Sequence, residues 1–212
     1  MSDFPTIYRR NLPHYQPYGA ILFFTYRLAG SLPWHVLDSL KEEREREERR
    51  LRLSGIESTK RKPLCNMIRR NIFLKFDNEL DTGNTGPTWL AQADIAELIC
   101  EAIFHRHPQE YELICFCTMA NHVHQVVLNI HDDAPINHPI GRLKSYTASE
   151  ANKILQGKGQ FWQHESSDHV VRTGKLGATI QYVLTNPVEA GLVRHWELWP
   201  HSWLNPRYDK PS

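Results

Sequence analysis

The chain has 212 residues, of which 41% are hydrophobic, and its formal net charge is +1. This length suffices for one domain with a buried core. The mean hydropathy is −0.52, and no apolar run approaches the length of a membrane span. The N-terminal segment lacks the apolar stretch of a signal peptide, so we expect a cytoplasmic protein. The nearly neutral charge excludes a broadly basic nucleic-acid surface and leaves room only for local basic patches.

The four cysteines do not have the spacing of a disulfide framework or of a structural zinc site. Cys115 and Cys117 fall in an apolar strand pattern. They are therefore predicted to be buried free thiols.

The first predicted strand is Ala20–Leu28, which is rich in strand-forming residues. Pro33 then opens a predicted helix that continues into Lys41–Leu51, where Glu and Arg are interleaved at helical spacing. We interpret this charged segment as a solvated helix or an inserted arm, an insertion at about residues 35–62. Gly83–Pro87 is predicted to be a loop.

A further helix is expected to begin at Asp94, which is predicted to cap it together with Glu97. Its predicted buried stripe consists of Ile95, Leu98, Ile99, Ala102 and Ile103. Tyr111–Met119 is the second predicted strand, and it is apolar on both faces. The short connection Ala120–Asn121 predicts an antiparallel hairpin with the strand that follows.

The second half of the chain continues this alternation. Ile140–Leu155 is a predicted helix that ends at Gly157–Gly159. Phe161–Arg172 is expected to be extended, and a last helix is expected from Gly177 to about Asn186. The order of strands and helices, with at least one hairpin, predicts a single α+β domain: an antiparallel sheet with helices packed on it, a ferredoxin-like split βαβ sandwich.

The segment Met119–Ile130 contains the triplet His122-Val123-His124 within an alternating apolar pattern. A strand places residues i and i+2 on one face, so both imidazoles point the same way and are close enough to share one metal ion. The chain also contains His105 and His107, at the end of a helical pattern. There, residues i and i+2 diverge by roughly 200° and do not face each other.

Tyr182 and Asn186 are spaced i, i+4 on the last predicted helix. They are expected roughly opposite its apolar stripe, about 40° apart. Tyr182 is then available as a nucleophile, and Asn186 can present a carbonyl oxygen to the same metal. Two structural interpretations stay open: Tyr182 is a surface aromatic, and Asn186-Pro187 caps a short helix. Tyr146 is the second candidate nucleophile.

Two ordered boxes carry a family resemblance. Met119–His124 resembles the Met-Pro-Asn-His-Val-His box of single-tyrosine HUH transposases, with Ala120 in place of the usual proline. Tyr182–Val193 resembles their Tyr-Ile-x-x-Asn-Pro-x-x-Ala-Gly-Leu-Val box. Further segments are similar to the subgroup called REP-associated tyrosine transposases: Arg10–Tyr15, Phe24–Leu28, Thr85–Leu90, Phe161–Gln163 and Asp168–Arg172.

The resemblance implies the HUH endonuclease fold and a single-stranded DNA endonuclease and strand transferase. His122, His124 and Asn186 would hold a divalent metal ion, Mg²⁺ or Mn²⁺, and Tyr182 would form a 5′-phosphotyrosine. The expected partner is a palindromic hairpin with single-stranded flanking guide sequence, bound by a monomer or a homodimer. Arg142, Lys144 and Arg172 are candidate phosphate contacts, and each is equally consistent with a solvated surface charge.

Two other function classes stay open from the sequence. One is a metal-dependent phosphodiesterase that activates water, with Tyr182 only structural. The other is a non-catalytic protein that binds DNA hairpins. A covalent DNA adduct distinguishes the transposase hypothesis from both.

Overall fold

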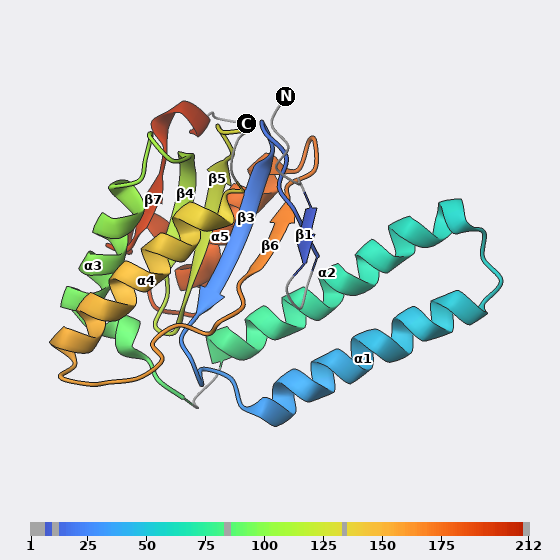
Figure 1. Cartoon of the computed structure of the whole chain (residues 1–212), viewed down its shortest axis with the longest axis horizontal. Helices are drawn as coiled ribbons and strands as arrows, with labels where there is room; N and C mark the ends of the chain where they lie inside the picture. The colour runs from blue at the N-terminus through green and yellow to red at the C-terminus, as the bar shows by residue number, and fades with distance from the viewer. Residues whose placement is uncertain (1–6, 10–12, 83–85, 133–134, 210–212) are drawn as a thin grey trace. The chain divides into compact units, whose positions relative to one another are not determined.

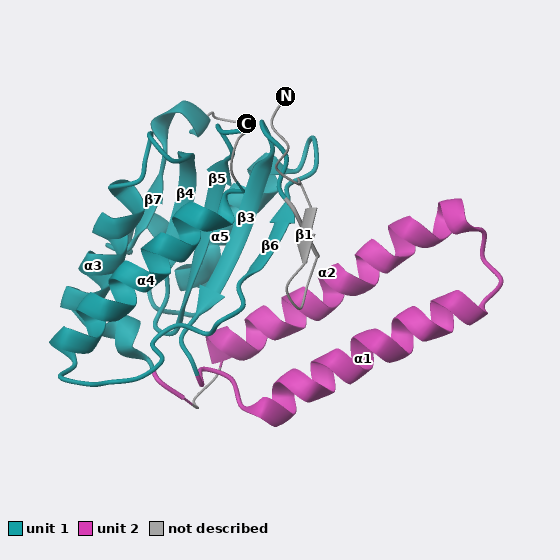
Figure 2. Cartoon of the chain, viewed as in Figure 1, with its two compact units in different colours: residues 1–29, 88–212 teal, residues 30–87 magenta. Residues whose placement is uncertain are grey.

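The computed structural model describes residues 7–9, 13–82, 86–132 and 135–209. The chain divides into two compact units, Met1–Ala29 with Thr88–Ser212 and Gly30–Pro87 (Figure 2). The predicted loop Gly83–Pro87 lies partly outside the described residues, as does the first half of Arg10–Tyr15.

The first unit is built on a five-stranded sheet in the order β6-β3-β5-β4-β7, in which every neighbouring pair is antiparallel (Figure 1). Its strands are β3 (Ile21–Arg27), β4 (Glu112–Thr118), β5 (His122–Leu128), β6 (Ser167–Val170) and β7 (Ser202–Leu204). The short strands β1 (Ile7–Arg9) and β2 (Pro13–Tyr15) form a separate two-stranded sheet.

Two helical crossovers connect the central strands. The chain passes from β3 through α3 (Ala93–Phe104) to β4, and from β5 through α4 (Asn137–Ile154) to β6. Both helices lie on the same side of the sheet (Figure 1). This is the split βαβ arrangement, so the predicted α+β fold class is confirmed. The predicted β4–β5 hairpin is also confirmed, with a register shift between Leu113 and Cys115.

After β6 the chain forms α5 (Leu176–Glu189), which contacts β4, β5 and β7. Three short 3-10 helices complete the unit, at Trp89–Ala91, Trp196–Leu198 and Pro206–Tyr208.

Alternation along the strands divides the sheet into two faces with different chemistry. The face toward α3 and α4 is the apolar core, with Leu22, Phe24, Tyr26, Val123 and Val127 all buried. The opposite face carries Phe23 and Thr25 from β3, and His122 and His124 from β5. The histidines therefore lie on the face of the sheet opposite the α3 and α4 core.

Helix α3 begins earlier than the sequence predicts. Its N-cap position is Gln92, without a side-chain cap, so the prediction of Asp94 as the cap is wrong. Asp94 lies in the first turn, where its Oδ1 accepts a hydrogen bond from the Ile95 amide at 2.9 Å. A carboxylate there is still favourable, because the N-terminus of a helix carries partial positive charge. The predicted stripe is buried except for Leu98, which is partly buried.

The second unit is an antiparallel pair of helices, α1 (Trp34–Leu53) and α2 (Ser58–Thr82) (Figure 2). Ion pairs Glu48–Arg69 at 3.0 Å and Glu43–Lys75 at 2.6 Å join the helices. No residue of α1 is buried, which agrees with a solvated charged helix.

Other predictions are met in part. Cys115 and Cys117 are buried free thiols, as expected. In the segment Phe161–Arg172, only Ser167–Val170 forms a strand, although Trp162 makes an isolated bridge with Leu28. No helix in the described part of the chain combines the length and the apolar character that crossing a membrane needs.

Candidate active site

The histidine pair lies on β5, in the middle of the sheet. His122 and His124 are both fully buried, and their Nε2 atoms are 3.1 Å apart. The prediction that both imidazoles share one face of a strand is therefore confirmed. Their ring nitrogens are close enough to bind one metal ion together.

Each imidazole has a neighbour at its other ring nitrogen. Nδ1 of His122 lies 2.7 Å from Oδ1 of Asn121, and Nδ1 of His124 lies 2.9 Å from Oγ1 of Thr25. Sequence reasoning missed both neighbours. The contact of Thr25 depends on the β3–β5 register, which places Thr25 directly opposite His124.

The second histidine pair of the chain has a different environment. His105 is exposed at the end of α3, whereas Nδ1 of His107 accepts a hydrogen bond from the Leu113 amide at 3.2 Å. His107 thus ties the connection after α3 to β4. The two side chains have separate surroundings, but both lie in the turn beyond the end of α3, so their helical spacing does not set them apart.

Helix α5 brings Tyr182 to the histidine face. The Tyr182 ring is half-buried, with its centroid 5.8 Å from that of His124 and 6.1 Å from that of Phe23. The alternative that Tyr182 is only a surface aromatic does not account for these contacts. Its ring lies beside the histidine pair instead.

Asn186 is 1% exposed, and its Oδ1 has no hydrogen-bond partner among the described residues. The prediction that Asn186 lies opposite the apolar stripe is wrong, because the buried side of α5 widens where the helix crosses several strands. The helix also continues through Pro187 to Glu189, so Asn186 does not cap a new helix. A buried amide oxygen without a donor is uncommon, and a bound ion is one group that would satisfy it.

The spacing of the two imidazole nitrogens fits one divalent ion. Two imidazole nitrogens about 2.1 Å from one ion, in adjacent coordination positions, are about 3.0–3.4 Å apart, which includes the observed spacing. The unsatisfied Asn186 oxygen offers a hard donor on the helix that also carries Tyr182. Mixed nitrogen and oxygen ligation suits Mn²⁺ well and Mg²⁺ less ideally.

His169 borders the site on β6, where it pairs with Phe23 in the sheet register. Its ring centroid lies 5.1 Å from that of Phe23, which also contacts His124 and Tyr182. Although the His169 side chain is exposed, partial desolvation by its neighbours lowers its pKa from 6.5; the Asp168 carboxylate opposes this shift, and the Arg172 guanidinium adds to it.

The three candidate phosphate contacts have different surroundings. Arg142 pairs with Glu110 on the surface. The Lys144 ammonium donates hydrogen bonds to the carbonyls of Gln163 and His164 and to the Ser166 hydroxyl. These bonds connect α4 to the loop that precedes β6. Arg172 is exposed after β6.

Tyr146, the second candidate nucleophile, is 51% exposed on α4. Helix α4 lies on the opposite side of the sheet from the histidines. The structure therefore does not bring Tyr146 to the histidine pair.

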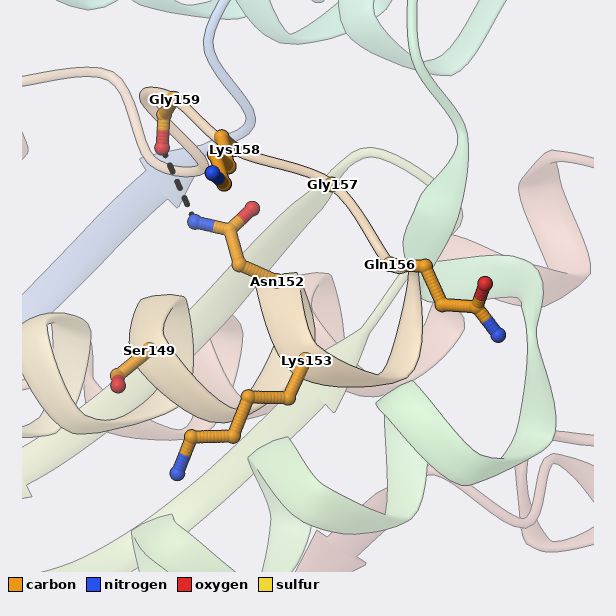
Figure 3. Close-up of a pocket in the computed structure, with 7 residues that line it drawn as sticks. All are labelled: Ser149, Asn152, Lys153, Gln156, Gly157, Lys158 and Gly159. Carbon is orange, nitrogen blue, oxygen red and sulfur yellow. Dashed lines mark hydrogen bonds between the residues drawn. The ribbon is translucent and has the colours of Figure 1, made fainter.

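A hollow of about 540 Å³ lies elsewhere, at the end of α4 (Figure 3). It is lined by Ser149, Asn152, Lys153 and the loop Gln156–Gly159, which Asn152 holds through a 3.0 Å bond to the Gly159 carbonyl. None of the predicted site residues lines it. The histidine face is thus the better candidate site.

Comparison with known proteins gives one informative likeness. No protein-family model matches the chain, and no curated protein matches it. Among solved structures, the chain is similar to a REP-associated tyrosine transposase bound to a REP hairpin. The TM-score is 0.51 with 17% sequence identity, over 92% of this chain and 80% of that chain. The chain thus has the fold of that transposase.

Proposed function

We propose that this protein is a metal-dependent endonuclease and strand transferase for single-stranded DNA. One observation carries the proposal: the Tyr182 ring lies against His124 of a buried histidine pair. A nucleophile beside candidate metal ligands is the arrangement that phosphodiester transfer to tyrosine needs. The fold likeness to a transposase bound to a DNA hairpin supports DNA as the substrate.

Three residues would hold the ion: His122 and His124 through imidazole nitrogens, and Asn186 through its amide oxygen. A divalent ion bound there neutralises charge on the scissile phosphate and makes its phosphorus more electrophilic. This help matters because tyrosine, with an ordinary pKa of about 10, is a poor nucleophile at neutral pH.

Tyr182 would perform the covalent step. Its Oη gives up a proton to solvent and attacks the phosphorus, the bond from phosphorus to the 3′ oxygen breaks, and that oxygen takes up a proton from solvent and leaves as a 3′-hydroxyl. The product is a 5′-phosphotyrosine, which retains the energy of the phosphodiester bond. Attack by a second 3′-hydroxyl reverses the step, so strands are rejoined without ATP.

The substrate is expected to be a hairpin with single-stranded flanks. Duplex DNA would shield the scissile phosphate, whereas an unpaired strand can be splayed onto a protein surface. Arg172 is the best supported of the proposed phosphate contacts, because it is exposed and near enough to His169 to affect its pKa. Arg142 and Lys144 are proposed as weaker contacts, since each already binds protein groups.

The decisive experiment mixes the protein with end-labelled single-stranded oligonucleotides from the flanks of its own gene, with Mn²⁺ or Mg²⁺. A labelled band that migrates with the protein on a denaturing gel supports the proposal. Cleavage without an adduct would indicate a phosphodiesterase that uses water. Metal-independent hairpin binding without cleavage would indicate a DNA-binding protein.

A further inference from the structure

We propose that the tip of the α1–α2 helix pair, residues 49–62, is a second DNA-binding surface, which contacts the phosphate backbone of duplex DNA without reading its sequence. We call this segment the basic tip. The proposal takes its partner from the proposed function, since a DNA hairpin has a paired stem, but it requires neither the metal ion nor Tyr182.

The basic tip concentrates positive charge. Residues 49–62 contain six basic residues and one acidic residue, Glu57. Their net charge is +5, so the other residues of the chain together carry −4, because the total is +1. A nearly neutral protein thus presents a strongly positive segment, which attracts a polyanion even though the whole chain does not.

The rest of the helix pair has a different charge pattern. There, basic residues of α2 meet acidic residues of α1, as in the ion pairs Arg69–Glu48 and Lys75–Glu43. At the tip, a short turn joins the basic end of α1 to the basic start of α2 (Figure 2). Like charges held close together repel each other. The fold of the helix pair therefore gathers positive charge that an external anion can neutralise.

Most of the basic side chains at the tip are available to a ligand. Arg61 has a structural role, because its Nη2 donates a hydrogen bond to the Ile56 carbonyl at 2.8 Å and so supports the turn. The other five are exposed, and within the described part of the chain none of them forms an ion pair or a side-chain hydrogen bond: Arg49, Arg50, Arg52, Lys60 and Lys62.

Helix stability does not account for all five. Arg50 and Arg52 lie in the last turn of α1, where the partial negative charge of the helix C-terminus favours a cation. Lys60 and Lys62 lie near the N-terminus of α2, where the partial positive charge disfavours a cation, and the first turn contains no acidic residue. Residues that oppose local stability are expected to serve a function.

The composition of the tip indicates duplex DNA as the partner. Residues 49–62 include no aromatic residue, so they offer no platform on which unpaired bases stack. Arginine and lysine bind phosphates, and B-DNA presents one phosphate charge per about 1.7 Å of its axis. Binding to an anionic membrane also needs apolar side chains that enter the lipid, and Leu53 is the exposed large apolar side chain of this segment. Duplex DNA is therefore the better match.

The test measures binding of the full-length protein in EDTA to a labelled blunt duplex of arbitrary sequence, by fluorescence anisotropy at several salt concentrations. Lys60→Gln combined with Lys62→Gln should reduce the magnitude of the slope of log K against log salt by about 1–2, because each contact with a B-DNA phosphate contributes about 0.9. Lys60→Arg combined with Lys62→Arg should retain the wild-type slope. An unchanged slope in the glutamine variant, or no duplex binding by wild type, would overturn the proposal.

Lys41→Gln combined with Arg46→Gln is the matched control. It removes the same charge from exposed positions on α1 that lie among glutamates, so the slope should stay that of wild type. Equal reductions in the two glutamine variants would show an effect of net charge alone and overturn the proposal. Urea unfolding adds a second readout: the Lys60→Gln, Lys62→Gln variant should be no less stable than wild type, because both lysines oppose the dipole of α2. Destabilisation of that variant would assign the lysines a structural role instead.

Phosphatidylserine vesicles test the membrane alternative. Sedimentation with vesicles that depends on Lys60 and Lys62, while duplex binding does not, would overturn the proposal. Its failure is distinguishable from failure of the proposed function. A protein that binds duplex DNA through these lysines but forms no adduct supports this inference and contradicts the nuclease, and a protein that forms the adduct with an unchanged slope in the glutamine variant does the reverse.

Discussion

The ring of Tyr182 lies against the ring of His124, with centroids 5.8 Å apart and planes inclined by 54°. The two residues come from different layers, since His124 is on the central strand β5 and Tyr182 is on α5. This contact joins the two sequence boxes, which are far apart along the chain. It makes Tyr182, and not Tyr146, the nucleophile to test first.

Tyr182→Phe is expected to abolish covalent attachment to single-stranded DNA while DNA binding is retained. The change removes only the hydroxyl, so the ring contacts with His124 and Phe23 persist. Denaturing gels with end-labelled oligonucleotides measure the adduct, and Tyr146→Phe is the control. Full adduct formation by Tyr182→Phe, or a loss confined to Tyr146→Phe, would reject the assignment.

His122→Ala and His124→Ala are each expected to lose metal-dependent cleavage, whereas His105→Ala and His107→Ala retain it. His107→Ala should also cost about 1 kcal/mol of stability, because its ring accepts a hydrogen bond from the Leu113 amide. Cleavage rates with added Mn²⁺, together with unfolding free energies, separate the two effects. Equal losses of cleavage in both pairs would contradict the metal assignment.

The elements that sequence patterns predicted best are those with one buried face. The alternation in β5 and the apolar stripe of α3 are strong signals, because burial on one side imposes a single period. Helix α2 was not predicted as a separate helix, since it buries only two residues and contains Pro63. Strand β7 was missed because three residues carry too short a pattern.

The sequence predicts the position of a site residue only where that position follows from the periodicity of a single strand or helix. The shared face of His122 and His124 follows from their spacing on a strand. The contact between Thr25 and His124 requires the pairing of strands about 100 residues apart, which no local pattern specifies. The burial of Asn186 depends on how α5 lies on the sheet, so a helical wheel placed it wrongly.

Asn186→Leu is expected to abolish Mn²⁺ binding while leaving the metal-free protein as stable as wild type, or more stable by about 1–3 kcal/mol. Leucine has nearly the shape of asparagine and removes a buried oxygen that lacks a partner. Chemical unfolding in EDTA measures stability, and calorimetry measures binding. A variant that is destabilised yet binds Mn²⁺ normally would show that Asn186 is a structural residue.

Mild acid is expected to destabilise the protein, and His169 is expected to contribute. Desolvation by its neighbours lowers the pKa of the exposed His169 from 6.5 in the folded state, so the unfolded chain takes up a proton first as the pH falls, and the contribution of His169 is small. Stability is therefore lost as the pH falls through 6.5 toward the folded-state pKa. Burial likewise lowers the pKa of His201, whose contribution has the same sign.

His169→Gln should reduce this loss of stability without abolishing it. Urea unfolding at about pH 7.5 and about pH 5.5 measures the loss in each protein. His105→Gln, in the turn after α3 and away from the sheet face that carries His169, should behave like wild type. If His169→Gln loses as much stability in acid as wild type does, His169 does not cause the effect.

Binding to a DNA hairpin with single-stranded flanks is expected to be tighter than binding to a matched blunt duplex, with a moderate dependence on salt. The net charge of +1 indicates that few phosphates are neutralised. Contacts with about three phosphates of a single strand give a slope of log K against log salt of about −2.

Arg172→Ala should reduce the magnitude of that slope by about 0.7, whereas Lys153→Ala should not, because the Lys153 ammonium already pairs with Glu150. Aromatic stacking supplies affinity that persists at high salt. Titrations at several salt concentrations give both quantities, and tighter binding to the blunt duplex would contradict the single-strand mechanism.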